Sequence, residues 1–207
     1  MIRIHSTLGS INGYKVRLLL ALLEVPYELV ELDMYAGEHK REPFLTLNPF
    51  GQMPALTDGA FTIADSHACL VYLARKYDES GRWLPSDAEG EAKVAEWLSK
   101  SANEVHQGPW MKRAKIRRPD AIKLSDAEID ARCDHILRLM DAHLTKRDWL
   151  ALARPTIADV SCFGPISMLT VSGYDTDKWP SVTRWLGAIR ALPRAHDIDG
   201  APFAARR

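Results

Sequence analysis

Residues 48–56 read Asn48-Pro49-Phe50-Gly51-Gln52-Met53-Pro54-Ala55-Leu56, and Pro54 comes directly before an apparent β-strand. A proline has no N–H to give to a sheet, so this position is expected at a sheet edge or in a turn. If the Met53–Pro54 bond is cis, the N–H and C=O of Met53 face outward, and an extended peptide-like ligand can pair with them. An ordinary trans turn proline is the alternative, and the surrounding sequence has to decide between the two.

The chain before this stretch has the pattern of a βαβ unit. Residues 1–5 alternate between apolar and polar side chains, and the polar turn Gly9-Ser10-Ile11-Asn12-Gly13 follows. Apolar residues then recur at helical spacing up to Pro26, and residues 27–32 are predicted as a second strand. Ligands of α/β sheets bind at the carboxyl ends of parallel strands, which makes Ser10 and Asn12 candidate site residues. A helix cap is the other interpretation of a hydroxyl in this turn.

Two more strands and a helix are predicted after Pro54. Residues 55–57 and 61–64 form a hairpin around Asp58-Gly59, a strong turn signal. Asp65-Ser66 then begins a helix, with Ser66 as the expected N-cap. A carboxylate beside the positive end of a helix can also hold a ligand that carries both an amine and a carboxylate. Both interpretations, cap alone and ligand site, stay open at this point.

The second half of the chain shows only helical periods. Apolar residues repeat at helical spacing around residues 94–98, 129–144, 157–164 and 182–189. The polar breaker at residues 78–81 precedes them and is interpreted as a domain boundary. The element order predicts an α/β domain over residues 1–79 and an all-helical domain over residues 86–207.

Composition narrows the function classes. The chain has 207 residues, 46% of them apolar, and 27 basic residues balance 27 acidic ones, so no overall field attracts nucleic acid or a charged membrane. The three cysteines, Cys69, Cys133 and Cys162, are far apart and are interpreted as small buried hydrophobes in a reducing cytoplasm. No metal site, signal sequence or membrane span is predicted.

Taken together in this order and spacing, the motifs resemble the glutathione transferase superfamily. The front half is similar to its thioredoxin-like domain, which has NPxGxxP around a cis-proline and then Asp-Ser at the third helix. The back half is similar to its helical domain through Pro155-Thr156-Ile157-Ala158-Asp159 and the run from Trp179 to Trp185. In this family pattern Asp159 is a structural capping residue. The resemblance covers nearly the whole chain.

The resemblance implies glutathione as co-substrate, with no other cofactor. The implied glutathione-binding residues are His39, Lys40, Gln52, Met53, Pro54, Asp65, Ser66 and His67. The Met53 backbone would pair with the cysteinyl unit, beside a cis Pro54. Asp65 and Ser66 would hold the γ-glutamyl amine and carboxylate, assisted by His67 or Gln52. His39 and Lys40 match a stretch that reaches the glycyl carboxylate.

The same resemblance implies where the chemistry takes place. Ser10 aligns with the thiol-activating serine of theta-like and delta-like members, with Asn12, Ser6, Thr7 and Tyr14 as further candidates. The helical domain would line the electrophile site, and its candidate residues are Asn103, His106, Trp110 and Met111. The alternative for these four is ordinary helical core or surface.

Three functions follow as candidates. The leading prediction is a detoxifying transferase that joins glutathione to small hydrophobic electrophiles, as a cytoplasmic homodimer without nucleic-acid or membrane partners. A glutathione-dependent disulfide or peroxide reductase is the first alternative, because Asn12-Gly13-Tyr14-Lys15-Val16 is similar to a turn of nu-like, disulfide-reducing members. The second alternative is an interaction protein that has the fold but no catalysis.

Overall fold

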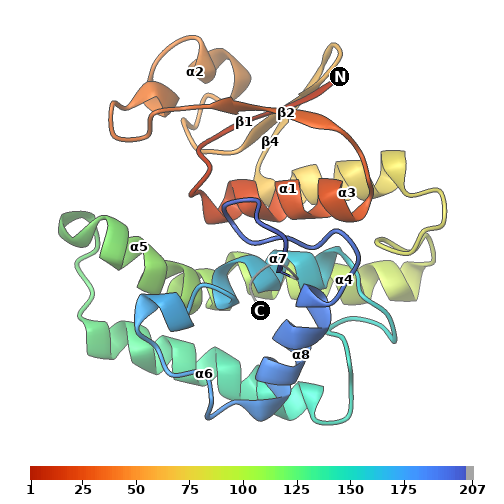
Figure 1. Ribbon diagram of the computed structural model, residues 1–207, viewed down its shortest axis with the longest axis vertical. Helices are drawn as coiled ribbons and strands as arrows, with labels where there is room; N and C mark the ends of the chain where they lie inside the picture. The colour runs from red at the N-terminus through yellow and green to blue at the C-terminus, as the bar shows by residue number, and fades with distance from the viewer. Residues whose placement is uncertain (204–207) are drawn as a thin grey trace. The chain divides into compact units, whose positions relative to one another are not determined.

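The computed structural model describes residues 1–203, which form two compact units (Figure 1). The first unit contains residues 1–81 together with the described part of the segment that begins at Ala191, and the second is Arg82–Arg190. This division differs from the expected helical domain over residues 86–207. The difference arises because residues 191–203 hydrogen-bond to the first unit, as in the bond from the Tyr14 hydroxyl to the His196 carbonyl.

A four-stranded mixed sheet forms the frame of the first unit. The strands are β1 (Ile2–Ser6), β2 (Tyr27–Glu31), β3 (Ala55–Asp58) and β4 (Phe61–Ala64), in the order β2-β1-β3-β4. β1 and β2 are parallel, as the predicted βαβ unit requires, whereas β3 is antiparallel to both β1 and β4. Gly59 closes the predicted hairpin with a φ of +61°, a left-handed conformation that glycine adopts without steric cost.

Two helices cover one face of this sheet. Helix α1 (Ile11–Leu22) and helix α3 (Ser66–Tyr77) lie side by side in Figure 1 and bury their apolar faces. The stretch over residues 37–49, expected to be irregular, contains the short helices η1 (Glu38–Lys40) and α2 (Phe44–Leu47). Both have at most four residues, too few for periodicity to reveal them.

The second unit contains only helical elements within Arg82–Arg190, as predicted. They are α4 (Ala88–Ala102), η2 (His106–Trp110), α5 (Met111–Arg117), η3 (Pro119–Ala121), α6 (Asp126–Leu144), α7 (Ile157–Ile166), η4 (Thr170–Ser172) and α8 (Pro180–Arg190). All ten residues of α7 are buried, so this helix forms the centre of the unit.

A capping box fixes the start of α7. The Thr156 hydroxyl accepts from the helix backbone, and the Asp159 carboxylate accepts from the Thr156 N–H at 2.9 Å. Asp159 also accepts from the Leu150 N–H at 2.9 Å and from the Trp185 indole at 3.0 Å. The predicted structural role of Asp159 is confirmed, because this buried carboxylate is surrounded by donors of the fold itself.

The cysteines are buried and free, as predicted from the sequence. Burial raises the pKa of Cys69 and of Cys133 to about 12, so neither thiol is a nucleophile at neutral pH. Among residues 1–203 no three His, Cys, Asp or Glu side chains gather as metal ligands. None of the helices in the described chain is both long and apolar enough to cross a membrane.

Candidate active site

The sheet register brings three distant segments to one end of the sheet. His5 of β1 is paired with Ala55 of β3, and Ala55 is paired with Ala64 of β4. The residues one step further along are Ser6, Pro54 and Asp65, so the turn after β1, the Met53–Pro54 pair and the start of α3 lie at the same edge. This convergence is what the predicted glutathione site requires.

The loop before β3 has a fixed shape. The Met53–Pro54 bond is cis, as expected, and a second cis bond, Glu42–Pro43, was not predicted. The Asn48 amide donates to the Gln52 carbonyl at 2.6 Å, which closes the loop on itself. Gly51 has a φ of +58°, and a Cβ there would lie 2.9 Å from the His39 carbonyl oxygen. Only glycine fits this position, because both the backbone conformation and the close approach exclude a side chain.

Ser10 caps helix α1 at this end of the sheet. Its hydroxyl oxygen accepts from the Gly13 N–H at 3.1 Å, and its own N–H donates to the Thr7 carbonyl at 3.0 Å. A serine hydroxyl has one donor proton and two acceptor lone pairs. The cap uses a lone pair, so the hydroxyl proton can still be donated to a sulfur. The two interpretations of Ser10, cap and thiol activator, are therefore compatible.

The other hydroxyls near this turn are less suited to activate a thiol. Ser6 is fully buried, and a Cβ on Gly13 would lie 2.3 Å from its hydroxyl oxygen. Tyr14 is also fully buried, and its hydroxyl donates to the His196 carbonyl at 2.5 Å. Thr7 is within 3.5 Å of the Glu31 carboxylate. Ser10 is half-buried and remains the best placed of the four.

Asp65, and not Ser66, caps helix α3. One oxygen of the Asp65 carboxylate accepts from the His67 N–H at 2.8 Å and from the Ala68 N–H at 3.1 Å. Ser66 is the first residue of the helix and is buried. The expected cap at Ser66 is wrong because the Asp65 carboxylate accepts from two backbone N–H groups at once. Asp65 is exposed to solvent.

The segment predicted to bind the glycyl carboxylate adjoins the same loop. Lys40 ends helix η1, and its ammonium lies 3.4 Å from the Phe50 carbonyl. His39 is half-buried behind Gly51, while Lys40 and Gln52 are exposed. The positive charge of Lys40 is thus close to the loop that leads to Met53.

Three of the four predicted electrophile residues lie together in the second unit. His106 and Trp110 of η2 stack with ring centroids 4.2 Å apart and planes 19° apart, and Met111 begins α5 directly after them. Gly108 lets η2 approach α6, because a Cβ there would lie 3.0 Å from the backbone of Arg132. The fourth residue, Asn103, is exposed, and its side chain is hydrogen-bonded to Gln107.

A buried cation that was not predicted from the sequence lies behind the Ser10 turn. Arg17 of α1 is 1% exposed, and its guanidinium donates to the Leu8 carbonyl at 2.6 Å and to the Ile198 carbonyl at 2.8 Å. Burial lowers the pKa of Arg17, although an arginine in a protein stays protonated. Arg17 lies among apolar residues in the sequence of α1, which indirectly indicates that it is buried. A buried arginine in turn needs hydrogen-bond or ion-pair partners.

The fold and this site define a glutathione-binding transferase, with a thioredoxin-like unit and a separate helical unit. Residues 2–75 match the family description "Glutathione S-transferase, N-terminal domain", and residues 109–188 match "Glutathione S-transferase, C-terminal domain". The chain belongs to the glutathione S-transferase family, as the motifs predicted. It is therefore a transferase enzyme, which sets aside the non-catalytic alternative.

Individual relatives agree with this assignment. Glutathione S-transferase hmp2 of Hypomyces subiculosus is 30% identical over 189 residues, which cover 84% of this chain and 88% of that protein. Glutathione S-transferase GstB of Escherichia coli (strain K12) is 29% identical over 99% of this chain and 100% of its own. Among solved structures, Glutathione Transferase E6 from Drosophila melanogaster superposes with a TM-score of 0.87 at 26% identity, covering 99% of this chain and 94% of that one.

Proposed function

We propose that this enzyme conjugates the thiolate of glutathione to small hydrophobic electrophiles. The observation that carries the proposal is the meeting of Ser10, the Met53 backbone and Asp65 at one end of the sheet. A hydroxyl donor, an extended backbone edge and a carboxylate at a helix start are what the sulfur, the peptide groups and the amine of glutathione need.

In the proposed complex, glutathione lies extended along this edge. The Met53 N–H and C=O pair with its cysteinyl unit, next to the cis Pro54. Asp65 binds the γ-glutamyl amine, and the start of α3 at Ser66 receives the γ-glutamyl carboxylate, assisted by His67 or Gln52. Lys40, together with His39, attracts the glycyl carboxylate at the other end of the peptide.

Ser10 is proposed to stabilise the thiolate. A free thiol has a pKa near 8.5, so only a few per cent is ionised at neutral pH. Lowering this pKa by about two units requires about 2.7 kcal/mol, which one charge-assisted hydrogen bond and the start of α1 can supply. Asn12, in the first turn of α1, is the second candidate donor.

The proposed reaction needs no general base. The thiol proton leaves to water when glutathione binds, and the thiolate then attacks the electrophile. With an aryl chloride, a carbon–sulfur bond forms, the carbon–chlorine bond breaks, and chloride leaves with the bonding electrons. His106, Trp110 and Met111 are proposed to contact the electrophile, and Asn103 to lie at the margin of that surface.

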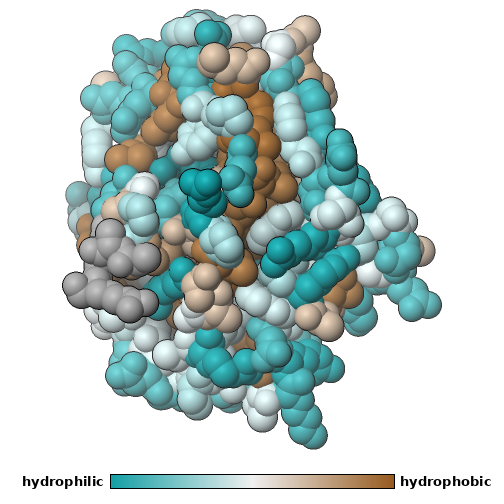
Figure 2. Space-filling model, turned by 45° about the vertical axis from the view of Figure 1, so that its right-hand side comes forward, coloured by the Kyte–Doolittle hydropathy of each residue, from teal (hydrophilic) through white to brown (hydrophobic). Residues whose placement is uncertain are grey.

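Homodimerisation, a cytoplasmic location and a role in detoxification belong to the same proposal. Phe50 is 83% exposed on the loop before β3, and aromatic side chains are enriched in protein–protein interfaces. One elongated hydrophobic strip also interrupts the mostly hydrophilic face in Figure 2. Both features support a homodimer, which sedimentation equilibrium of the full chain tests directly.

A glutathione-dependent disulfide reductase is the second candidate. The turn that begins with Ser10 and continues through Asn12, Gly13 and Lys15 favours it, because nu-like members with a similar turn reduce disulfides. Turnover of 1-chloro-2,4-dinitrobenzene compared with hydroxyethyl disulfide decides between the two. Dominant turnover of the disulfide overturns the first proposal.

The role of Ser10 is tested by titrating bound glutathione through its thiolate absorbance. Ser10→Ala is expected to return the thiol pKa toward 8.5 and to lower kcat/KM by about 25-fold at pH 7 and by nearly 100-fold at about pH 5.5. Ser10→Thr keeps both the cap and the donor and should stay close to the parent enzyme. Thr62→Ala, which removes an exposed hydroxyl from β4, is the matched control. An unchanged thiol pKa in Ser10→Ala moves the role to Asn12 or to a backbone N–H.

Glutathione binding is tested separately with Asp65→Asn. Asparagine has nearly the same size and shape as the aspartate found here and keeps an oxygen for the cap, but it removes the negative charge. We expect glutathione to bind about 10-fold or more weakly, as measured by calorimetry. Unchanged affinity contradicts the proposed contact with the amine.

A further inference from the structure

Helix α5 and its flanks carry a concentration of positive charge in a chain that is neutral overall. Residues 105–119 contain no acidic side chain but five basic ones, Lys112, Arg113, Lys115, Arg117 and Arg118. The segment includes Trp110 and Met111, which are proposed electrophile contacts. The charge is therefore carried by the same segment that is proposed to hold the substrate.

Most of this charge has a structural explanation within the described residues. Lys112 is buried, and its ammonium forms an ion pair with the Asp130 carboxylate at 2.7 Å. The Asp126 carboxylate lies 3.8 Å from the same ammonium. Lys115 donates to the Leu124 carbonyl, and Arg118 is exposed to solvent beyond the end of α5. Lys112 and Lys115 thus stabilise the connection between α5 and α6, and Arg118 is solvated.

Arg113 differs from these neighbours. It is half-buried, and its buried Nε has no hydrogen-bond partner within residues 1–203. A buried donor without a partner costs about 1–3 kcal/mol, so a donor left in this state requires an explanation. No hydrogen bond or ion pair joins the Arg113 guanidinium to another described residue, so its terminal nitrogens are available to a ligand that supplies an acceptor.

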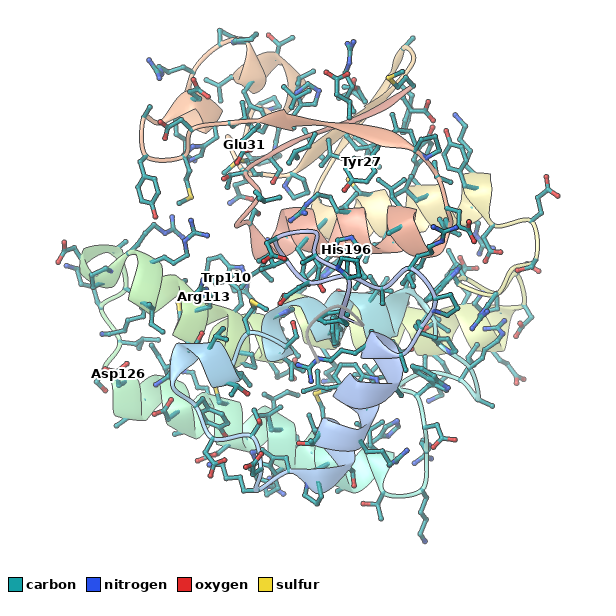
Figure 3. All side chains as sticks on the ribbon, in the orientation of Figure 1. Tyr27, Glu31, Trp110, Arg113, Asp126 and His196 are labelled. Atoms are coloured by element: carbon teal, nitrogen blue, oxygen red, sulfur yellow. The ribbon has the colours of Figure 1, made fainter. Side chains whose placement is uncertain are left out.

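Arg113 also shares a helix face with an aromatic surface. The backbone is helical at Trp110, with φ −65° and ψ −44°, so Arg113 lies one turn further on the same face. Trp110 is in turn stacked on His106. Figure 3 labels Trp110 and Arg113 close together at the start of α5. The Trp110 ring and the Arg113 guanidinium lie on one helix face, and together they can bind a planar aromatic ring that carries an anionic group.

We infer that Arg113 is a specificity residue that binds a carboxylate on the electrophile, while Trp110 stacks on its aromatic ring. The inferred substrates are aromatic electrophiles with a carboxylate substituent, a narrower class than hydrophobic electrophiles in general; this inference rests on the proposed function. The planar fork of an arginine matches the two oxygens of a carboxylate, which a lysine cannot do in the same way. Arg113 orients the substrate and exchanges no proton with it.

A matched pair of substrates tests the inference. The acid 4-chloro-3,5-dinitrobenzoate and its methyl ester share the reacting ring and the chloride leaving group, but only the acid is charged. For Arg113→Met we expect kcat/KM to fall about 10- to 100-fold for the acid and less than about twofold for the ester. Arg113→Lys should restore part of the loss. Arg118→Met, which removes an exposed cation next to the same helix, should change either value by less than about twofold.

A binding measurement separates this inference from the proposed reaction. Unreactive 3,5-dinitrobenzoate is titrated calorimetrically into the parent enzyme and into Arg113→Met, without glutathione. Binding that weakens about 10-fold or more in the variant supports the anion site, even if neither chloride substrate is turned over and the proposed reaction fails. The inference is overturned if Arg113→Met lowers kcat/KM by the same factor for the acid and for the ester, so that their ratio is unchanged. Arg113 would then act only on the fold.

Discussion

Replacing Arg17 by Met is expected to weaken the first unit and to disturb the Ser10 turn together. Arg17 donates to the Leu8 carbonyl, two residues before Ser10, and to the Ile198 carbonyl of the C-terminal segment. One guanidinium thus joins the turn before α1 to the segment that follows the helical unit. His196 of the same segment, labelled in Figure 3, accepts from Tyr14 through its carbonyl.

The size of the effect follows from these contacts. Methionine fills most of the space but leaves the two carbonyls without their donor, at about 1–3 kcal/mol each. Removing a buried charge also removes its desolvation cost, which offsets part of the loss. We therefore expect the free energy of unfolding to fall by about 2–4 kcal/mol.

Urea unfolding of the parent enzyme and the variant measures this change. Arg194→Met is the matched control, because Arg194 belongs to the same segment but makes an exposed ion pair with Glu24 at 3.2 Å. Its loss should cost less than about 1 kcal/mol. The thiol pKa of bound glutathione should rise in Arg17→Met and stay constant in Arg194→Met, because only Arg17 holds the Leu8 carbonyl.

Two results would refute this reasoning. Equal stability losses in the two variants would mean that burial and hydrogen bonding at Arg17 contribute nothing beyond a surface ion pair. A large stability loss in Arg17→Met with an unchanged thiol pKa would show that the Ser10 turn keeps its geometry without the guanidinium.

Further predictions concern a close contact in α1 and a carboxylate in the hairpin. Gly13→Ala should cost about 1–3 kcal/mol, because the new Cβ meets the Ser6 hydroxyl at 2.3 Å, whereas Gly187→Ala, with open space around it in α8, should gain about 0.5–1 kcal/mol in urea unfolding. Equal changes in the free energy of unfolding for Gly13→Ala and Gly187→Ala contradict the packing argument. The hydrogen bond from Lys76 is the main cause that lowers the pKa of Asp58 from 3.8 to about 2. The ionised Asp58 carboxylate therefore stabilises the folded state fully above pH 3.8, and this stabilisation is lost as the pH falls toward about 2. The stability difference between the parent enzyme and Asp58→Asn should shrink over that range, and a constant difference would contradict the assignment.

Local sequence signals predicted most of the elements. The periods of α1, α3, α6 and α8 depend on neighbours three or four residues apart, so they can be recognised without a fold. The capping box at Thr156 and Asp159 and the Asp58-Gly59 hairpin are local in the same sense. The motif order was sufficient to predict the family and the edge of the sheet where glutathione is proposed to bind.

The choice among similar residues could not be made from the sequence. Ser6, Ser10 and Tyr14 all lie near one turn, and only burial and partners distinguish them; the partner of Tyr14 is 182 residues away. The cap of α3 was assigned to Ser66 because serine is a common N-cap, but backbone geometry gives it to Asp65.

The sequence by itself determined the long helices, the hairpin, the family and the segments of the candidate site, because those signals depend on spacing along the chain. Only the tertiary structure decided which hydroxyl keeps a free proton, which unit residues 191–203 join, and that the buried Nε of Arg113 lacks a partner within the described chain. These properties depend on burial and on contacts between residues far apart in sequence, and no local pattern records them.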